Sequence, residues 1–144
     1  MKDKLVKLPY LKLEMKNILN EIREIRLSQD DLRNYSSVSL NGMPKGKRYD
    51  DQTALKVSKI IDDYEKRIKE DLLPELERVQ HEIYKIKRVI VQLSGKEYFL
   101  INARYIEERP WKYIERELHY GRASVFRINR NAIKRLAELW DKID

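Results

Sequence analysis

Apolar residues recur at alternating spacings of four and three positions through most of the first 93 residues. Over residues 4–33 this stripe is formed by Leu11, Met15, Ile18, Ile22, Ile25 and Leu32, with Gln29 at its one polar position. Such spacing keeps the side chains on one face of an α-helix and is typical of a coiled-coil seam. We therefore expect a long helix over residues 4–33. We place Pro9 near its start, where a missing N–H group costs little.

A second stripe of the same kind predicts another long helix over residues 52–93. Its members are Val57, Ile61, Tyr64, Ile68, Leu72, Leu76, Val79, Ile83, Ile86, Ile90 and Leu93. Two consecutive four-residue steps around Leu72 interrupt the alternation beside Pro74. Because proline removes a helical hydrogen bond and clashes with the preceding turn, we expect a kink or a break between Asp71 and Pro74. The two seams can pack on each other, on a second copy of the chain, or on both.

The composition favours the same all-α class. The 144 residues include only 4 glycines and 4 prolines, which strand-connecting turns would consume in larger numbers. The absence of cysteine excludes disulfides and thiolate metal sites. No apolar run approaches the roughly 18 residues of a membrane span, and charges interrupt the N-terminal residues. We therefore expect no signal peptide, no membrane association and a cytoplasmic location.

Residues 34–51 lack the helical period and are rich in Ser, Asn, Gly and Pro, which predicts a loop. Gly42, Gly46 and Lys47 have the spacing G-x-x-x-G-K, one residue short of a phosphate-binding loop. Arg48 replaces the final hydroxyl residue of that motif, and no apolar strand precedes it. A flexible basic loop is therefore expected here rather than a nucleotide site.

Residues 94–144 predict a second domain of three helices, distinct from a helical hairpin or coiled-coil oligomerisation region over 1–93. Ser94 and Glu97 have capping-box spacing ahead of a helix over 96–105. A second helix, 111–118, follows Pro110, and a three-residue turn separates it from a third, 122–141. The expected inward residues are Phe99, Leu100, Ala103, Trp111, Ile114, Leu118, Val125, Ile128, Ala132, Leu136 and Leu139. A short helix, a tight turn and a longer helix predict a helix-turn-helix.

The outer face of the third helix is predicted to be cationic. If Val125 faces the core, a rotation of about 100° per residue turns outward Ala123, Arg127, Arg130 and Lys134, with Phe126 and Asn131 beside them. From Leu118 to Ala137 there is no acidic residue, although the chain holds 24 acids against 31 bases, a net charge of +7. Because phosphates repel carboxylates, this pattern favours a DNA-facing helix.

Position along this helix suggests individual roles. Residues at the start of a recognition helix usually reach base edges, and later ones meet the backbone. The expected base-reading residues are Arg122, Ala123, Phe126 and Arg127, and the expected phosphate contacts are Arg130 and Lys134, with Asn131 adjacent. Ser124 either binds a phosphate or caps the helix. Trp111 and Lys112 open the second helix, whose N-terminus favours a phosphate, although Trp111 also suits the core.

Motifs in this segment resemble the region-four helix-turn-helix of sigma factors. They are Arg104-Tyr105-Ile106, then Trp111, Ile114, Leu118 and Tyr120, then Ser124, Val125, Arg127, Ala132 and Leu136. The same pattern is similar to the end of small phage transcriptional regulators of the RinA and ArpU type. Those families often have Ser or Thr where this chain has Gly121. Because glycine has no side chain, no side-chain contact from this position to a DNA phosphate is expected. The resemblance implies control of phage or prophage late genes in a bacterial host cell.

Catalytic side chains are scarce, because His81 and His119 lie on different expected elements and no cysteine is present. We expect a non-enzyme with no metal and no cofactor. The favoured function is a sequence-specific regulator that binds double-stranded DNA as a homo-oligomer, most simply a dimer. One alternative is a phage terminase small subunit, although such subunits usually carry the DNA-binding unit first. Another is an adaptor that binds RNA polymerase through the basic helix.

Overall fold

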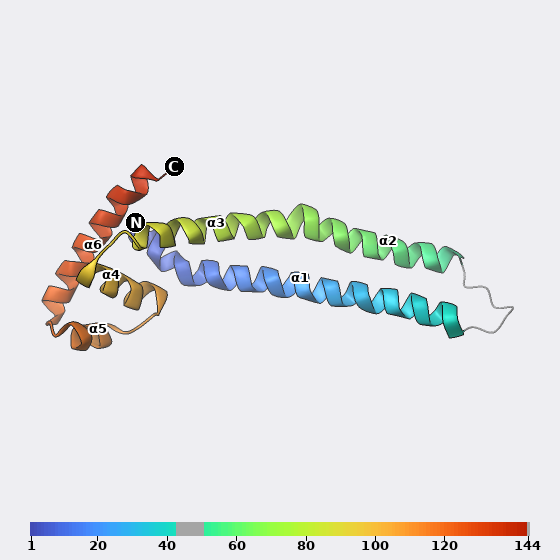
Figure 1. Ribbon diagram of the computed structural model, residues 1–144, viewed down its shortest axis with the longest axis horizontal. Helices are drawn as coiled ribbons and strands as arrows, with labels where there is room; N and C mark the ends of the chain where they lie inside the picture. Colours follow the sequence, from blue (N-terminus) through green and yellow to red (C-terminus); the bar gives the residue numbers. More distant parts are fainter. Residues whose placement is uncertain (43–50, 144) are drawn as a thin grey trace. The chain divides into compact units, whose positions relative to one another are not determined.

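The computed structural model describes residues 1–42 and 51–143, with side chains for 1–34 and 52–143, and every regular element in them is a helix (Figure 1). The elements are α1 (Lys2–Gly42), α2 (Asp51–Arg67), η1 (Ile68–Leu72), α3 (Leu73–Ile90), α4 (Gly95–Ile101), η2 (Asn102–Ile106), α5 (Trp111–Leu118) and α6 (Arg122–Lys142). The two η segments are π-helical turns. The expected all-α class is confirmed.

The chain forms two compact units that divide the long helices between them. Unit 2 is continuous and spans Met15–Arg78. Unit 1 combines Met1–Glu14 with Val79–Asp144. The first turns of α1 and most of α3, from Val79 on, therefore belong with the C-terminal helices.

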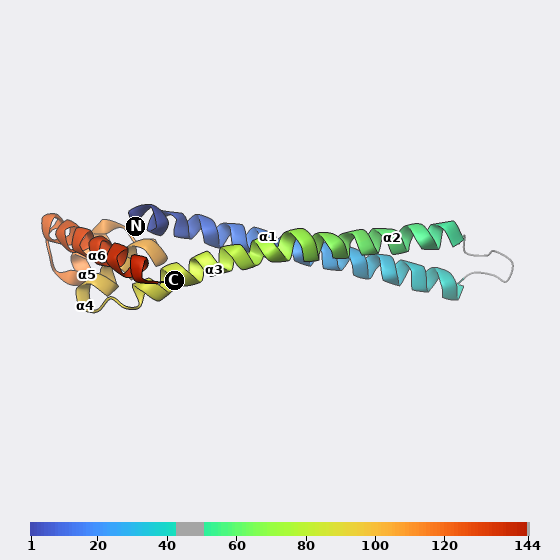
Figure 2. The ribbon, with the colours of Figure 1, turned by 90° about the horizontal axis from the view of Figure 1, so that it is seen from above.

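In unit 2, the rest of α1 runs antiparallel to α2, and the two lie side by side in both views (Figures 1 and 2). The predicted seams face each other within one chain, with Ile18, Ile25, Ile68, Leu72 and Leu76 buried. Ion pairs cross between the helices from Arg26 to Glu65 and from Arg67 to Glu21. Of the pairings that the sequence allows, this structure contains the intramolecular one.

Gln29, the polar member of the α1 seam, is completely buried. Its Nε2 donates to the main-chain carbonyl of Ile61 at 3.0 Å and to Oε2 of Glu65 at 3.2 Å. Its Oε1 accepts a hydrogen bond from Nη1 of Arg26 at 3.1 Å. Hydrogen bonds from Arg26 and Gln29 lower the pKa of the Glu65 carboxyl below its ordinary value. A buried amide with all these partners satisfied fixes which turn of α2 lies opposite Gln29.

The expected interruption before Pro74 is a π-helical turn, η1, rather than a break. The N–H of Leu73 bonds to the carbonyl of Ile68, five residues earlier. This wider turn accommodates the extra residue of the two four-residue steps, so Ile68, Leu72 and Leu76 all stay buried. Pro74 is the second residue of α3 and lies directly after this turn. The helix continues through it, although its missing N–H removes one helical hydrogen bond.

Two expectations for α1 are wrong. The helix begins at Lys2, so Pro9 lies inside it, and only one helical hydrogen bond is lost there. Complete burial of Leu5 and Leu8 in unit 1 stabilises these turns despite that loss. The helix also continues to Gly42, so residues 34–42 of the expected loop are helical. The expected basic loop residues Gly46, Lys47 and Arg48 lie outside the described residues.

The core of unit 1 joins the base of the long helices to the C-terminal helices. Its fully or nearly fully buried members are Leu5, Leu8, Val79, Ile86, Val89, Ile90, Leu100, Ile101, Ala103, Ile114, Val125, Ala132 and Leu136. Of the inward residues expected in the C-terminal segment, Phe99, Trp111, Leu118, Ile128 and Leu139 are only partly buried. This core holds α5 and α6 in place.

The predicted capping box at the start of α4 does not form. Ser94 occupies the N-cap position, but its side chain makes no capping hydrogen bond. Gly95 follows with a φ of +60°, a left-handed conformation that favours glycine. Glu97, the expected reciprocal partner, forms an ion pair with Arg135 of α6 instead. At this helix, the ion pair between Glu97 and Arg135 therefore forms in place of the local capping hydrogen bonds.

Candidate nucleic-acid interface

The two helices α5 and α6 and the turn between them follow the predicted bounds closely. His119 ends α5 in the left-handed conformation, with a φ of 58°. Gly121 is the N-cap residue of α6 in an extended conformation, and its carbonyl accepts a hydrogen bond from the N–H of Val125 at 3.0 Å. Pro110 precedes α5 as its N-cap residue, as expected for a helix that begins at Trp111.

Aromatic packing fixes α5 against α6 on the side away from the core. The rings of Trp111 and Phe126 meet edge to face, with centroids 5.0 Å apart and an interplanar angle of 87°. The guanidinium of Arg104 lies 4.7 Å from the centre of the Trp111 ring. Trp111 is half-buried, so its observed role is packing between the two helices.

The hydroxyl of Tyr105, in the Arg104-Tyr105-Ile106 motif, connects η2 to α6. This side chain is buried, and its hydroxyl donates to Oδ1 of Asn129 at 3.2 Å. Burial raises the pKa of the Tyr105 phenol above its ordinary value. Because Asn129 faces Tyr105, the opposite side of this part of α6 is left for solvent.

The outer face of α6 is exposed where the sequence predicts it. Ala123, Phe126, Arg127, Arg130, Asn131 and Lys134 are all exposed, whereas Val125, Ala132 and Leu136 are completely buried. Ser124 is half-buried, and Lys112, near the start of α5, is exposed. The ten sequence-predicted residues thus lie on α5 and α6, and the outward orientation of the α6 group is confirmed.

Most arginines of the C-terminal segment already have partners within the chain. Those that form an ion pair or stack on an aromatic ring are Arg104, Arg109, Arg116, Arg122 and Arg135. Arg127, Arg130 and Lys134 differ from these arginines in their contacts. Among the residues whose side chains the structure describes, these three have no hydrogen-bonding, ionic or stacking partner. Their spacing of three and four positions places them on one face of α6.

Carboxylates from other elements pair with the first residue of α6 and with Arg135 in its later half, but no described carboxylate pairs with the cations between them. Near the start, Oε1 of Glu115 lies 3.4 Å from Nε of Arg122. Further along, Oε2 of Glu97 lies 3.2 Å from Nη1 of Arg135. Residues 118–137 contain no acid, but the fold therefore places carboxylates from other segments beside them. Among the described residues of α6, the stretch between these two pairs, with Arg127, Arg130 and Lys134, keeps its positive charge unpaired.

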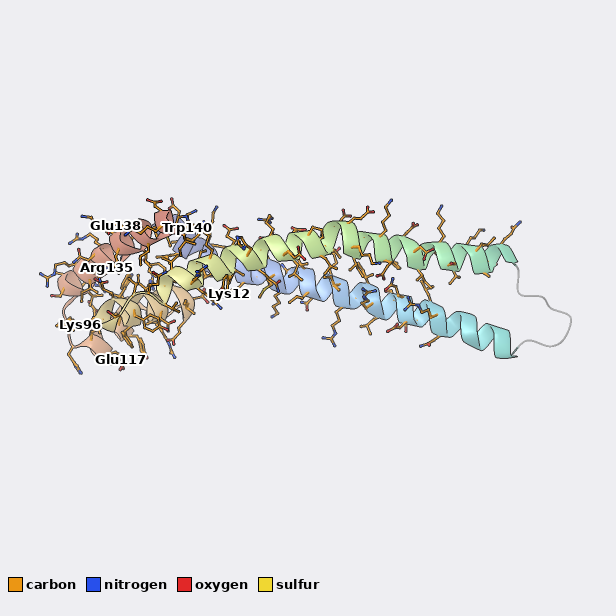
Figure 3. The ribbon with its side chains drawn as sticks, turned by 45° about the horizontal axis from the view of Figure 1, so that its top comes forward. Lys12, Lys96, Glu117, Arg135, Glu138 and Trp140 are labelled. Carbon is orange, nitrogen blue, oxygen red and sulfur yellow. The ribbon has the colours of Figure 1, made fainter. Side chains whose placement is uncertain are left out.

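A polar hollow of about 280 Å³ adjoins the later part of this face, and Asn131, Lys134 and Glu138 line it together with the Glu97–Arg135 pair. Figure 3 shows Arg135 and Glu138 on α6. The Oε2 atom of Glu97 is buried and makes an ion pair with Arg135 without hydrogen-bond geometry. This hollow has mixed charge, so it is a weaker anion site than the Arg127–Arg130 stretch.

Two lysines contact Trp140 near the end of α6. The sequence analysis did not predict a role for this residue. The ammonium groups of Lys4 in α1 and Lys85 in α3 lie 4.5 Å and 4.3 Å from the centre of its indole ring. Trp140 is labelled near the end of α6 in Figure 3. These cation–π contacts connect α6 to both long helices within unit 1.

The structure offers no clustered ligands for a metal in the part it describes, where no three His, Asp or Glu side chains come together suitably. His81 is exposed on α3, and His119 is exposed in the turn. None of the described helices has the length and apolar character needed to cross a bilayer.

No protein-family model matches the chain, and neither a curated protein nor a solved structure matches it. The likeness to sigma-factor region four and to RinA- and ArpU-type regulators therefore depends only on the sequence motifs quoted above.

Proposed function

We propose that the chain binds double-stranded DNA by inserting the outer face of α6 into the major groove, with α5 and α6 acting as a helix-turn-helix. The observation that carries this proposal is the unpaired charge of Arg127 and Arg130, on an exposed face opposite the buried Val125 and Ala132. Arginines that a fold keeps exposed and unpaired are available to phosphates and guanines. The major groove, about 12 Å wide, accepts one α-helix.

Roles within this face follow from what each side chain already contacts. Arg127 reads base edges, because it lies near the start of α6 and has no competing carboxylate. Arg130 and Lys134 contact phosphates further along. Arg122 reaches bases only when DNA displaces its ion pair with Glu115, which is 21% exposed. Phe126 offers an exposed ring edge to a thymine methyl while it packs on Trp111.

The biological role proposed for this activity is transcriptional regulation in the cytoplasm of a bacterial host, at phage or prophage late genes. The Trp111, Ile114 and Leu118 motif and the α6 motif support it through their resemblance to sigma-factor region four. Binding to RNA polymerase without binding to DNA would favour the adaptor alternative instead.

The decisive experiment is a salt titration of DNA binding, with the full chain and a fluorescent random-sequence duplex, read by anisotropy. The test variant is Arg127→Ala/Arg130→Ala. Its affinity should fall at every salt concentration. The magnitude of the slope of log K against log salt should decrease by about 1, because Arg130 is the phosphate contact of this pair and each lost phosphate contact contributes about 0.9.

A matched control removes the same charge from α1 of unit 2 as Arg23→Ala/Arg33→Ala, both at exposed positions. This control should keep the wild-type slope to within about half a contact, because it lies outside the proposed interface. Equal slopes for the test variant and the wild-type chain would overturn the proposal, as would wild-type binding with no salt dependence.

A further inference from the structure

The long helix α1 carries a second apolar face that its own chain leaves uncovered. Val6, Tyr10 and Leu13 are 48%, 70% and 55% exposed, although the seam residues of the same turns are buried. Their spacing of four and three positions places them on one side of the helix, as a packing seam would. An exposed apolar stripe of this kind usually marks an interaction site.

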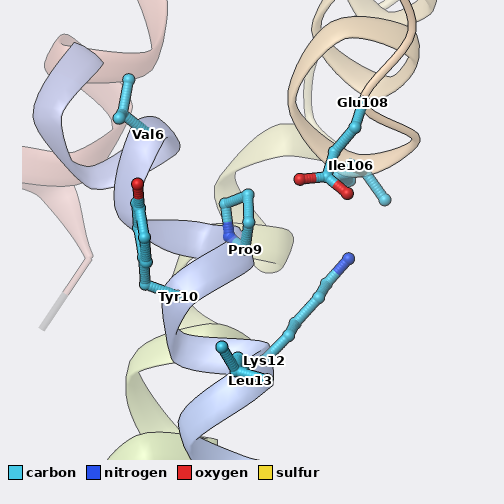
Figure 4. A pocket seen from close by; sticks show the side chains of 7 residues that line it. All are labelled: Val6, Pro9, Tyr10, Lys12, Leu13, Ile106 and Glu108. Carbon is cyan, nitrogen blue, oxygen red and sulfur yellow. The ribbon is translucent and has the colours of Figure 1, made fainter.

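This face forms one wall of a groove of about 510 Å³ in unit 1. The other wall is the end of η2 and the segment that follows it, represented by Ile106 and Glu108 (Figure 4). Glu108 has a φ of 58°, a left-handed conformation that is rare for a residue other than glycine. Backbone hydrogen bonds from the neighbouring Glu107 to Asn102 and from Arg109 to Ala103 hold the segment in this shape. Such local strain is often found at functional sites.

Two opposite charges line the same groove without pairing. Figure 4 shows Lys12 extending from α1 on the side of the groove where Glu108 lies. In the described part of the chain neither Lys12 nor Glu108 forms an ion pair or a hydrogen bond. A surface with an apolar centre, a free ammonium and a free carboxylate complements itself under a two-fold rotation.

We propose that a second copy of this chain docks in the groove through the same surface. A two-fold axis near Lys12 and Glu108 places each ammonium opposite Glu108 of the partner subunit, and Tyr10 and Leu13 are buried between the copies. Most residues of the predicted seams are buried within the chain and are not available to a second copy, so the groove face is the surface that we assign to the dimer. Self-association is measured without DNA, so the dimer proposal is tested independently of the DNA-binding proposal.

The mass of the full chain in solution tests this assignment by sedimentation equilibrium across the micromolar range. The expected result is a concentration-dependent rise to twice the 17.5 kDa of one chain. Lys12→Glu and Glu108→Lys should each weaken the dimer by about tenfold or more, because like charges then face each other. The double variant Lys12→Glu/Glu108→Lys should restore it, because the charges are exchanged.

Leu13→Asp should also weaken the dimer. Lys59→Glu, an exposed charge reversal on α2 in unit 2, should leave it unchanged. Circular dichroism of each variant verifies that the helices are intact. A chain that stays monomeric would overturn the proposal. So would a dimer that none of the groove variants weakens, or one that the exchanged charges do not restore.

Discussion

Arg122, the first residue of α6, pairs its Nε with Oε1 of Glu115 in α5 at a distance of 3.4 Å. The pair spans the turn between the two helices and occupies the arginine that the sequence assigns to base reading. Since Arg122 is 59% exposed, the pair contributes at most about 1 kcal/mol to folding stability. In the proposed DNA-binding function its effect is larger, because the carboxylate would compete with phosphate and base for Arg122.

Substituting Glu115→Gln should therefore strengthen DNA binding. The change releases Arg122 and removes a negative charge beside the proposed interface, so the affinity should rise several-fold at low salt. The slope of log K against log salt should change by less than about 1, because Arg122 is assigned to bases and not to a phosphate. Glu117→Gln, next to Arg116 on an exposed turn of α5, is the matched control and should have a smaller effect. Weaker binding by Glu115→Gln would show that Glu115 positions Arg122 for DNA.

Trp140 should account for a measurable part of the stability of unit 1. Trp140→Leu removes cation–π contacts with Lys4 and Lys85, each worth about 0.5–1 kcal/mol at a partly exposed site. The free energy of unfolding in urea should fall by about 1–2 kcal/mol.

Controls for Trp140 separate the charge contacts from general apolar packing. Tyr84→Leu, at a position 63% exposed on α3, should change the free energy of unfolding by less than about 0.5 kcal/mol. Lys4→Gln and Lys85→Gln should each lower stability in the wild-type chain but not in the Trp140→Leu background. Equal losses in both backgrounds would argue against the cation–π contacts.

Sequence periodicity predicts what depends on local spacing. The seams, the bounds of α5 and the outward orientation of Arg127 and Arg130 all follow from apolar residues repeating at helical intervals. The interruption before Pro74 is also recognisable, although the spacing does not distinguish a π-helical turn from a break. Conversely, Pro9 suggested a helix start, and burial of Leu5 and Leu8 overrides that local preference.

What the sequence could not supply are contacts between residues far apart in the chain. The acid-free run from Leu118 to Ala137 ignores Glu97 and Glu115, which the fold brings to Arg135 and Arg122. The failure of the capping box has the same cause, because Arg135, with which Glu97 forms an ion pair, lies 38 positions later in the chain. Counting charges along the chain therefore overestimates the number of unpaired cations on α6. Among its described residues the structure leaves Arg127, Arg130 and Lys134 unpaired.

The pKa of Glu65 gives the helix pair of unit 2 an acid-side dependence. Hydrogen bonds from Arg26 and Gln29 lower this pKa below 4.5 in the folded chain. A group with a lowered folded pKa stabilises the fold above its unfolded pKa, and that contribution is lost as the pH falls through the folded pKa. Glu65→Gln should therefore lower stability slightly near neutral pH and flatten part of its decline below about pH 4.5. Urea titrations at several pH values measure this, and identical pH profiles for the two chains would contradict it.

Gln29 should be more important for the specificity of helix pairing than for stability. Gln29→Leu replaces a completely buried amide with an apolar side chain of similar size. Its partner, the carbonyl of Ile61, still accepts the hydrogen bond of the α2 helix itself, so no buried group is left unsatisfied. The free energy of unfolding should stay equal or rise, because buried polar groups often cost more than apolar replacements.

The cost of Gln29→Leu should instead appear as mispairing. With a wholly apolar seam, α1 can slide by a heptad on α2 or pair with another chain, as coiled coils do without a polar seam residue. Glu21→Cys and Arg67→Cys report the register, because the native side chains at these two positions meet in an ion pair across the helices. A short thiol-specific crosslinker should join them within one chain when Gln29 is present. In the Gln29→Leu background the same reagent should give a mixture of intramolecular and intermolecular products.

A second substitution at this position separates the polar contact from the volume of the side chain. Gln29→Ala leaves a cavity and removes the hydrogen bond to Glu65, so it should lower the free energy of unfolding by about 1–3 kcal/mol. Gln29→Leu fills the same space and should avoid that loss. Urea unfolding of the two variants measures the difference, and an equal loss for both would mean that the amide itself stabilises the helix pair.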